Sequence, residues 1–80
     1  MRETIELELK NIFSTVLGID PSLIDLALSP DNCPKWDSLA HIHLISAIEE
    51  KYNLTLPIEV QVEILTFELA VLTIIEFLKG

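Results

Sequence analysis

Three segments of the sequence carry apolar residues at the spacing of an α-helix, and this pattern indicates the fold class. The segments span residues 3–17, 38–52 and 67–78. In each, apolar residues recur three or four positions apart, which places them on one face of a helix. The expected buried stripes are Ile5, Leu9, Ile12, Phe13 and Val16 in the first segment, Leu39, Ile42, Ile45, Ile48 and Tyr52 in the second, and Phe67, Ala70, Val71, Ile74 and Leu78 in the third. The pattern predicts an all-α bundle.

Residues typical of helix ends flank the three segments. Gly18 follows the first segment and suits a left-handed C-cap. Asp37 and Thr66 precede the second and third segments and are good N-caps. Asn53 is expected to end the second helix. These residues predict the helix boundaries.

The connection over residues 18–36 is long, and three prolines prevent a continuous helix within it. Asp20 followed by Pro21 predicts a helix of one or two turns over residues 21–27. Residues 29–34 have the composition of an open loop. The apolar residues expected to pack from the short helix onto the bundle are Leu23, Ile24 and Leu26.

Residues 54–64 alternate apolar and polar side chains, which is typical of a strand. Pro57 and the absence of a partner strand argue against a sheet, because a lone strand cannot satisfy its backbone. We therefore predict a loop over residues 54–57 and a short helix over 58–64. The expected fold is a small four-helix bundle with three longer helices, a short third helix and a long first loop. Residues 1–80 are expected to form a single domain.

The chain is strongly acidic, with 13 Asp and Glu residues against 5 Lys and Arg, a net charge of −8. Such a chain repels phosphate backbones and anionic lipid surfaces, so nucleic acids and membrane surfaces are not expected partners. Basic proteins, or basic patches on larger ones, are expected instead. The sequence has no run of 18 apolar residues, so no membrane-spanning helix is expected. The charged first residues lack the apolar core of a secretory signal.

Few residues in the chain suggest catalysis or metal binding. With only two glycines, a glycine-rich phosphate loop is excluded. Cys33 is the only cysteine, so a reducing, cytoplasmic compartment is expected. Its thiol is expected to be unactivated, because Lys35 is the one basic residue nearby. His41 and His43 diverge on a helix and lack the spacing of metal ligands. The acids are scattered at helical spacings without a suggested cleft. We expect no metal site and no enzymatic activity.

Ser38 stands directly after the N-cap Asp37, at the end of the long loop. Its hydroxyl is expected at the edge of the fold, above the positive end of a helix dipole, where a phosphate is well held. A helix-start serine without a function has the same local features. Trp36 is expected to anchor the end of the loop against the bundle, or instead to lie exposed beside Ser38 as a partner contact.

At this point the sequence resembles the acyl carrier protein family over nearly its whole length. Asp37-Ser38-Leu39 resembles the Asp-Ser-Leu signature of that family. Residues 48–52, Ile-Glu-Glu-Lys-Tyr, resemble the segment that ends the family's second helix. Leu56-Pro57 resembles the Ile-Pro that precedes its third helix. The resemblance is specific because the three segments occur in register in an acidic helical chain of this length.

The resemblance implies that Ser38 is the attachment point of 4′-phosphopantetheine, donated by coenzyme A and transferred by a phosphopantetheinyl transferase. It implies a cytoplasmic, monomeric carrier that presents acyl thioesters to the loading and processing enzymes of a fatty-acid-like or polyketide-like pathway. Asp37 would cap the helix and help the transferase. Expected partner contacts are Trp36, Leu39 and Ile42 around the arm, with Glu49, Glu50 and Glu59 as charged contacts. The acyl chain would lie between the second and fourth helices, near Ile45, Ile64 and Ile74, or remain on the surface.

Two departures from the family pattern favour a specialised pathway. In fatty-acid carriers the first turns of the second helix bear acids that basic partner surfaces recognise. Here these turns contain no acid and have the sequence Ala40-His41-Ile42-His43. Trp36 stands where the family commonly has glycine. Two alternatives remain open from the sequence. One is an aminoacyl or peptidyl carrier of a nonribosomal pathway. The other is a helical interaction module that is never modified and whose contact surface is the helix over 67–78.

Overall fold

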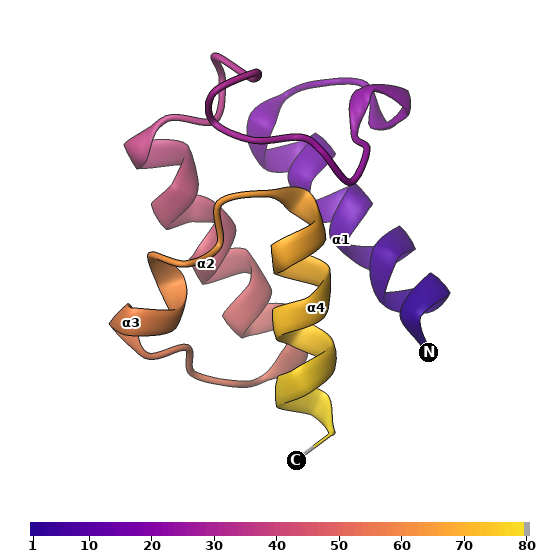
Figure 1. The fold of residues 1–80 in the computed structure, drawn as a ribbon, viewed down its shortest axis with the longest axis vertical. Helices are drawn as coiled ribbons and strands as arrows, with labels where there is room; N and C mark the ends of the chain where they lie inside the picture. Colours follow the sequence, from indigo (N-terminus) through magenta and orange to yellow (C-terminus); the bar gives the residue numbers. More distant parts are fainter. Residues whose placement is uncertain (80) are drawn as a thin grey trace.

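In the computed structural model, which describes residues 1–79, the chain forms four α-helices and no β-strand within that range (Figure 1). A single 3₁₀ turn, η1, lies in the first connection. The elements are α1 (Arg2–Leu17), η1 (Pro21–Leu23), α2 (Ser38–Tyr52), α3 (Ile58–Gln61) and α4 (Phe67–Leu78). The predicted helical bundle with a short third helix and a long first loop is therefore confirmed.

Helix α1 packs against both α2 and α4, and the shared core lies between these three helices. At its centre, the Phe13 ring meets the rings of Trp36 and Phe67 edge to face, at centroid distances of 5.2 and 5.1 Å. Such pairs stabilise a core beyond the area that they bury. The buried residues are Ile5, Leu9, Phe13, Leu17, Ile24, Leu28, Cys33, Trp36, Leu44, Ile45, Ile48, Leu56, Ile64, Phe67, Ala70, Val71 and Ile74.

The caps predicted from the sequence are confirmed at four helix ends. Gly18 adopts a left-handed conformation with φ 67°, and its N–H donates to Ser14 O at 2.9 Å. The side chains of Asp37 and Thr66 accept from the backbone N–H of the residue three positions on, at 2.8 and 3.0 Å. Asn53 ends α2 with φ 52°, which asparagine tolerates better than most residues. Local residue chemistry therefore fixes these boundaries.

The buried face of α2 differs from the predicted stripe. Leu39 and Ile42 are 63% and 60% exposed, whereas Leu44, outside the predicted stripe, is buried. Three residues turn an α-helix through about 300°, so side chains spaced three apart drift around it by about 60° at each step. Leu39 and Ile42 are therefore rotated by about 180° and 120° from Ile48, which faces the core. In α4 the predicted stripe is correct except at Leu78, which is 38% exposed.

The predicted helix over residues 21–27 is wrong beyond its first turn, because η1 ends at Leu23. A new turn follows, in which the Asp25 carboxylate accepts from Ala27 N at 3.0 Å. As a result Leu23 and Leu26 are 62% and 39% exposed, and only Ile24 of the three expected contacts is buried.

The rest of the first connection is a series of hydrogen-bonded turns rather than an open loop. The Asn32 side chain accepts from Ser29 N and donates to Ala27 O, both at 2.9 Å. Earlier in the same connection, the backbone carbonyls of Leu28 and Leu26 accept from the first N–H groups of α4, at 2.9 and 3.2 Å. The connection therefore crosses the N-terminal end of α4 along a fixed path, at the top of Figure 1. The short third helix also ends early, at Gln61 rather than residue 64.

Candidate functional site

Ser38 lies exposed at the first position of α2, as the sequence predicts. The Asp37 carboxylate accepts a hydrogen bond from the backbone N–H of Ala40. The backbone N–H groups of Ser38 and Leu39 have no partner within residues 1–79. The Ser38 hydroxyl makes no hydrogen bond to a described residue either. Free N–H groups at a helix start attract anions, and the helix dipole adds to this. The site therefore combines a free hydroxyl with a cradle suited to a phosphate.

Trp36 supports this site from inside the core, since only 2% of its surface is exposed. Its ring packs edge to face against Phe13 of α1. The prediction that Trp36 anchors the loop end is confirmed, and the alternative that its side chain lies exposed beside Ser38 is wrong. This anchor lies two residues before Ser38 and fixes where α2 begins.

His41 links the loop, α2 and the C-terminal end of α3 through both ring nitrogens. The indole Nε1–H of Trp36 donates to His41 Nδ1 at 3.0 Å, so Nδ1 is the unprotonated nitrogen. Nε2 therefore carries the proton and donates to Gln61 O, at 2.9 Å. The imidazole also stacks on Trp36, at a centroid distance of 6.0 Å. Nothing in the sequence indicates this bridge, because Gln61 lies 20 positions away from His41.

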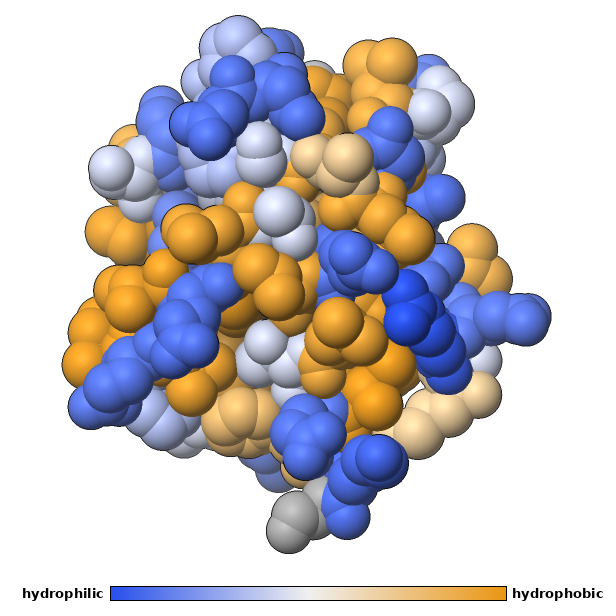
Figure 2. Space-filling view, viewed as in Figure 1, coloured by the Kyte–Doolittle hydropathy of each residue, from blue (hydrophilic) through white to orange (hydrophobic). Residues whose placement is uncertain are grey.

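A groove of about 580 Å³ runs beside Ser38, between the start of α2 and the turn that follows α3. Its apolar walls include Ile42, Val62 and Leu65, each more than half exposed. Figure 2 shows that apolar side chains also gather over α3 and the adjoining face of α4. The groove is lined by Pro30, Trp36, Asp37, Ser38, His41, Ile42, Val62, Ile64 and Leu65.

The three glutamates predicted as charged contacts have different surroundings. Glu49 is half-buried, and its Oε2 accepts from Leu56 N at 2.8 Å, so this carboxylate holds the loop after α2 in place. Glu50 and Glu59 are exposed and form no ion pair within residues 1–79. These two carboxylates are free to meet a cationic partner.

The three residues expected to line an interior pocket are all buried. Ile45, Ile64 and Ile74 are 5%, 2% and 0% exposed and belong to one packed core. Of the three, Ile64 alone borders the groove beside Ser38. The space next to Ser38 is therefore a surface groove whose floor reaches the core.

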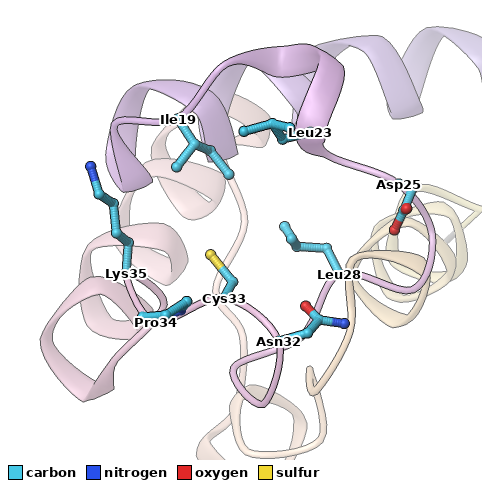
Figure 3. A pocket seen from close by; sticks show the side chains of 8 residues that line it. All are labelled: Ile19, Leu23, Asp25, Leu28, Asn32, Cys33, Pro34 and Lys35. Atoms are coloured by element: carbon cyan, nitrogen blue, oxygen red, sulfur yellow. The ribbon is translucent and has the colours of Figure 1, made fainter.

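A second hollow, of about 510 Å³, lies under the first connection and does not include Ser38 (Figure 3). The sulfur of Cys33 points into it toward Ile19, although Cys33 is only 6% exposed and forms no disulfide. Its lining residues are Ile19, Leu23, Asp25, Leu28, Asn32, Cys33, Pro34 and Lys35.

No helix within residues 1–79 is long and apolar enough to cross a membrane. In the same range, no three side chains of His, Cys, Asp and Glu gather in a way that could hold a metal ion. Compared with models of known protein families and with the sequences of curated proteins, the chain finds no match.

Proposed function

We propose that this chain is an acyl carrier protein and that Ser38 carries its 4′-phosphopantetheine arm. The observation that supports this most is the exposed, unbonded Ser38 hydroxyl at the start of α2, directly after a capping aspartate. The residues present fit the arm's phosphate, because the free N–H groups of Ser38 and Leu39 lie at the positive end of α2. The short α3 and the long first connection agree with the fold that the resemblance implies.

The transfer from coenzyme A forms a bond between Ser38 Oγ and phosphorus. It breaks the pyrophosphate bond of coenzyme A, so the nucleotide portion leaves and the serine proton passes to solvent or to the transferase. When attached, the arm supplies a thiol that holds an acyl group as a thioester. The protein's own contribution is to present the arm and to be recognised, which agrees with a chain for which we expect no catalytic activity.

The groove beside Ser38 supports a lipophilic cargo. Its volume of about 580 Å³ falls in the range of roughly 300–1,000 Å³ that small-molecule sites occupy. The cargo would contact Ile42, Val62 and Leu65, all of which border the groove. We assign the acyl chain to this groove rather than to the packed space between α2 and α4.

The partner enzymes are proposed to contact the exposed face of α2. The first eleven residues of this helix, Ser38–Ile48, contain no Asp, Glu, Lys or Arg, so Leu39 and Ile42 offer an apolar contact. Glu50 and Glu59 would meet basic groups at its edge. This mixture favours enzymes of a specialised pathway. Because Cys33 is a free thiol, we place the carrier in the cytoplasm.

Intact-mass spectrometry after incubation with coenzyme A, magnesium and a broad-specificity phosphopantetheinyl transferase tests the proposal. The wild type should gain the mass of one phosphopantetheine, and Ser38→Ala should gain none. Ser46→Ala is the matched control, because Ser46 is another exposed serine of α2. An unchanged mass in folded, initially unmodified wild type with several transferases would overturn the proposal. Adenylating enzymes that load an amino acid onto the arm would instead establish the nonribosomal carrier.

The unmodified interaction module has weaker support. Helix α4 turns four apolar side chains into the core, namely Phe67, Ala70, Val71 and Ile74. The apolar side chains on the outer side of α4 are partly covered, since Leu69 and Leu72 are 40% and 42% exposed. The most exposed aliphatic side chains of the second half of the chain lie instead around Ser38 and α3.

A further inference from the structure

Helix α3 is held to the rest of the bundle by few buried contacts. It has four residues, none of which is fully buried, and of these Val60 packs partly buried against the core. The extensive helix–helix contacts of the structure are those that α1 makes with α2 and with α4. The Gln61 side chain donates to Leu56 O at 2.7 Å, but this bond stays within the segment around α3. The hydrogen bond between His41 and Gln61 O is therefore the polar connection from α3 to α2.

We propose that His41 is a latch that positions α3 beside Ser38, and that protonation of its ring releases α3 and opens the groove. This inference rests on the proposed function only where it assigns an acyl chain to the groove. His41 acts here as a positioning residue and touches no reacting atom. The latch itself consists of the side chains of Trp36 and His41 and the carbonyl of Gln61.

The closed latch requires a neutral imidazole. Nδ1 must accept from Trp36 while Nε2–H donates to Gln61 O, and a neutral ring provides one acceptor and one donor. A second proton on Nδ1 would face the indole N–H of Trp36, donor against donor. Trp36 is buried, so its N–H would then lose its partner away from water, which is costly. A protonated ring therefore disfavours the closed arrangement.

Few charged groups near His41 could oppose this effect. Asp37 is the other titratable residue that lines the groove, and its carboxylate is bonded to Ala40 N. On the side of α3, Glu59 and Glu63 are exposed to solvent. On the loop side, Asp31 and Lys35 are exposed as well, and Lys35 donates to Gly18 O at 3.4 Å. Acidification supplies the second ring proton, so the latch would open as the pH falls.

Opening the latch would change how well a cargo is sheltered. With α3 released, the side of the groove formed by Val62 and Leu65 could move away from Ile42. An acyl chain in the open groove would leave more readily for a partner's active site. Protonation shifts the equilibrium between the closed and open forms only as far as His41 binds the proton more tightly in the open form. The change with pH is therefore graded.

The fluorescence of Trp36, the only tryptophan, tests the latch in unmodified protein. We expect the emission and the indole N–H resonance in NMR spectra to change together between about pH 5 and 8. His41→Gln, which cannot gain a proton in this range, should lose both changes. His43→Gln is the matched control, because His43 is exposed on another side of α2 and should leave them intact. Signals that stay flat in folded wild type would overturn the latch.

A direct reading of the ring needs no variant. The ¹⁵N shifts of His41 should show a proton on Nε2 alone at neutral pH. A proton on Nδ1 there would contradict the hydrogen bond from Trp36 and overturn the proposal.

The effect on α3 is measured by amide hydrogen exchange, corrected for the intrinsic dependence of exchange on pH. Protection of residues 60–64 should fall roughly tenfold on acidification, which corresponds to about 1.4 kcal/mol of added preference for the open form. His41→Gln should show no such fall, and equal protection at both ends of the range in wild type would overturn the release of α3.

These readouts separate the two proposals. If Trp36 shows the transition but Ser38 is never modified, the latch is supported and the carrier function is overturned. A chain that is modified at Ser38 but shows no transition of Trp36 would leave the carrier in place and overturn the latch. In acyl-loaded protein, thioester hydrolysis should then be insensitive to His41→Gln.

Discussion

At the scale of single residues, Asp37 and Ser38 divide the work at the start of α2. The Asp37 carboxylate binds Ala40 N and secures the helix end, while the neighbouring hydroxyl remains free. A cap that used Ser38 itself would occupy the oxygen that the proposed function needs. The order of these two residues therefore separates the fold requirement from the proposed modification.

Replacing Asp37 tests this division. Asp37→Ala should lower the free energy of unfolding by about 1 kcal/mol, because the cap is lost, whereas Asp37→Asn should stay close to the wild type. Urea unfolding measures both. If Asp37 also helps the transferase through its charge, both variants should slow the modification of Ser38.

Thr66→Ala is the control for this experiment, because it removes the equivalent cap of α4. It should lower stability by a similar amount and leave the rate of modification unchanged. A wild-type rate of modification in Asp37→Ala would show that Asp37 serves the fold alone.

At the scale of helices, the sequence predicted where the three longer helices begin and end better than which face of α2 is buried. Asp37, Thr66 and Gly18 act on their own backbone, so their effect is visible locally. The buried face of α2 depends on where α1 lies, and Leu39 and Ile42 drift away from that face.

The least predictable part of the candidate site is the bridge through His41. Ser38 and its cap are recognisable from neighbouring residues alone. The bridge to Gln61 exists only after α3 has folded back beside α2, and a histidine in a helical stripe carries no sign of its partner. Its acceptor on α3 is also a backbone carbonyl, which every residue has.

Tyr52 connects α2 to α1, and this contact makes stability depend on pH. Its hydroxyl donates to Glu8 Oε1 at 2.8 Å. Partial burial, then the hydrogen bond and the negative charge of Glu8, raise the pKa of Tyr52 above its usual value. A raised pKa in the folded state means that the protonated phenol stabilises the fold. This stabilisation is complete below the unfolded pKa of about 10 and is lost as pH rises above it.

We therefore expect the free energy of unfolding to fall above about pH 10 in the wild type and to fall less in Tyr52→Phe. Denaturant unfolding at several alkaline pH values measures this. Tyr52 is the only tyrosine, so the ultraviolet absorbance of its phenolate reports its ionisation directly. Ionisation at the pH of a free tyrosine in folded protein would contradict the raised pKa.

At the scale of the whole molecule, the acidic charge is a cost to the fold. A net charge of −8 is held in a body with a radius of gyration of 11.4 Å. The three ion pairs within residues 1–79 engage Glu6, Glu8 and Glu68 and leave most acids facing one another through solvent. At low ionic strength these acids repel over distances comparable to the molecule.

Salt should therefore stabilise the fold. Raising the ionic strength from about 0.01 M to 0.1 M shortens the Debye length from about 30 Å to 10 Å, so the melting temperature should rise. Calorimetry in sodium chloride measures this rise. Glu50→Lys, which places a cation among the exposed acids, should melt higher at low salt and gain less from added salt. A melting temperature that is flat in salt for both proteins would contradict the argument.

The burial of Cys33 has a practical consequence for labelling. The chain has one cysteine of its own, and its sulfur is turned inward beneath the first connection, with 6% of the residue exposed. A maleimide reagent should therefore react slowly with the unmodified protein. If Ser38 is modified as proposed, the arm would provide the one accessible thiol. A dye or spin label could then be placed on the arm without any engineered substitution, and its motion would report where the arm rests.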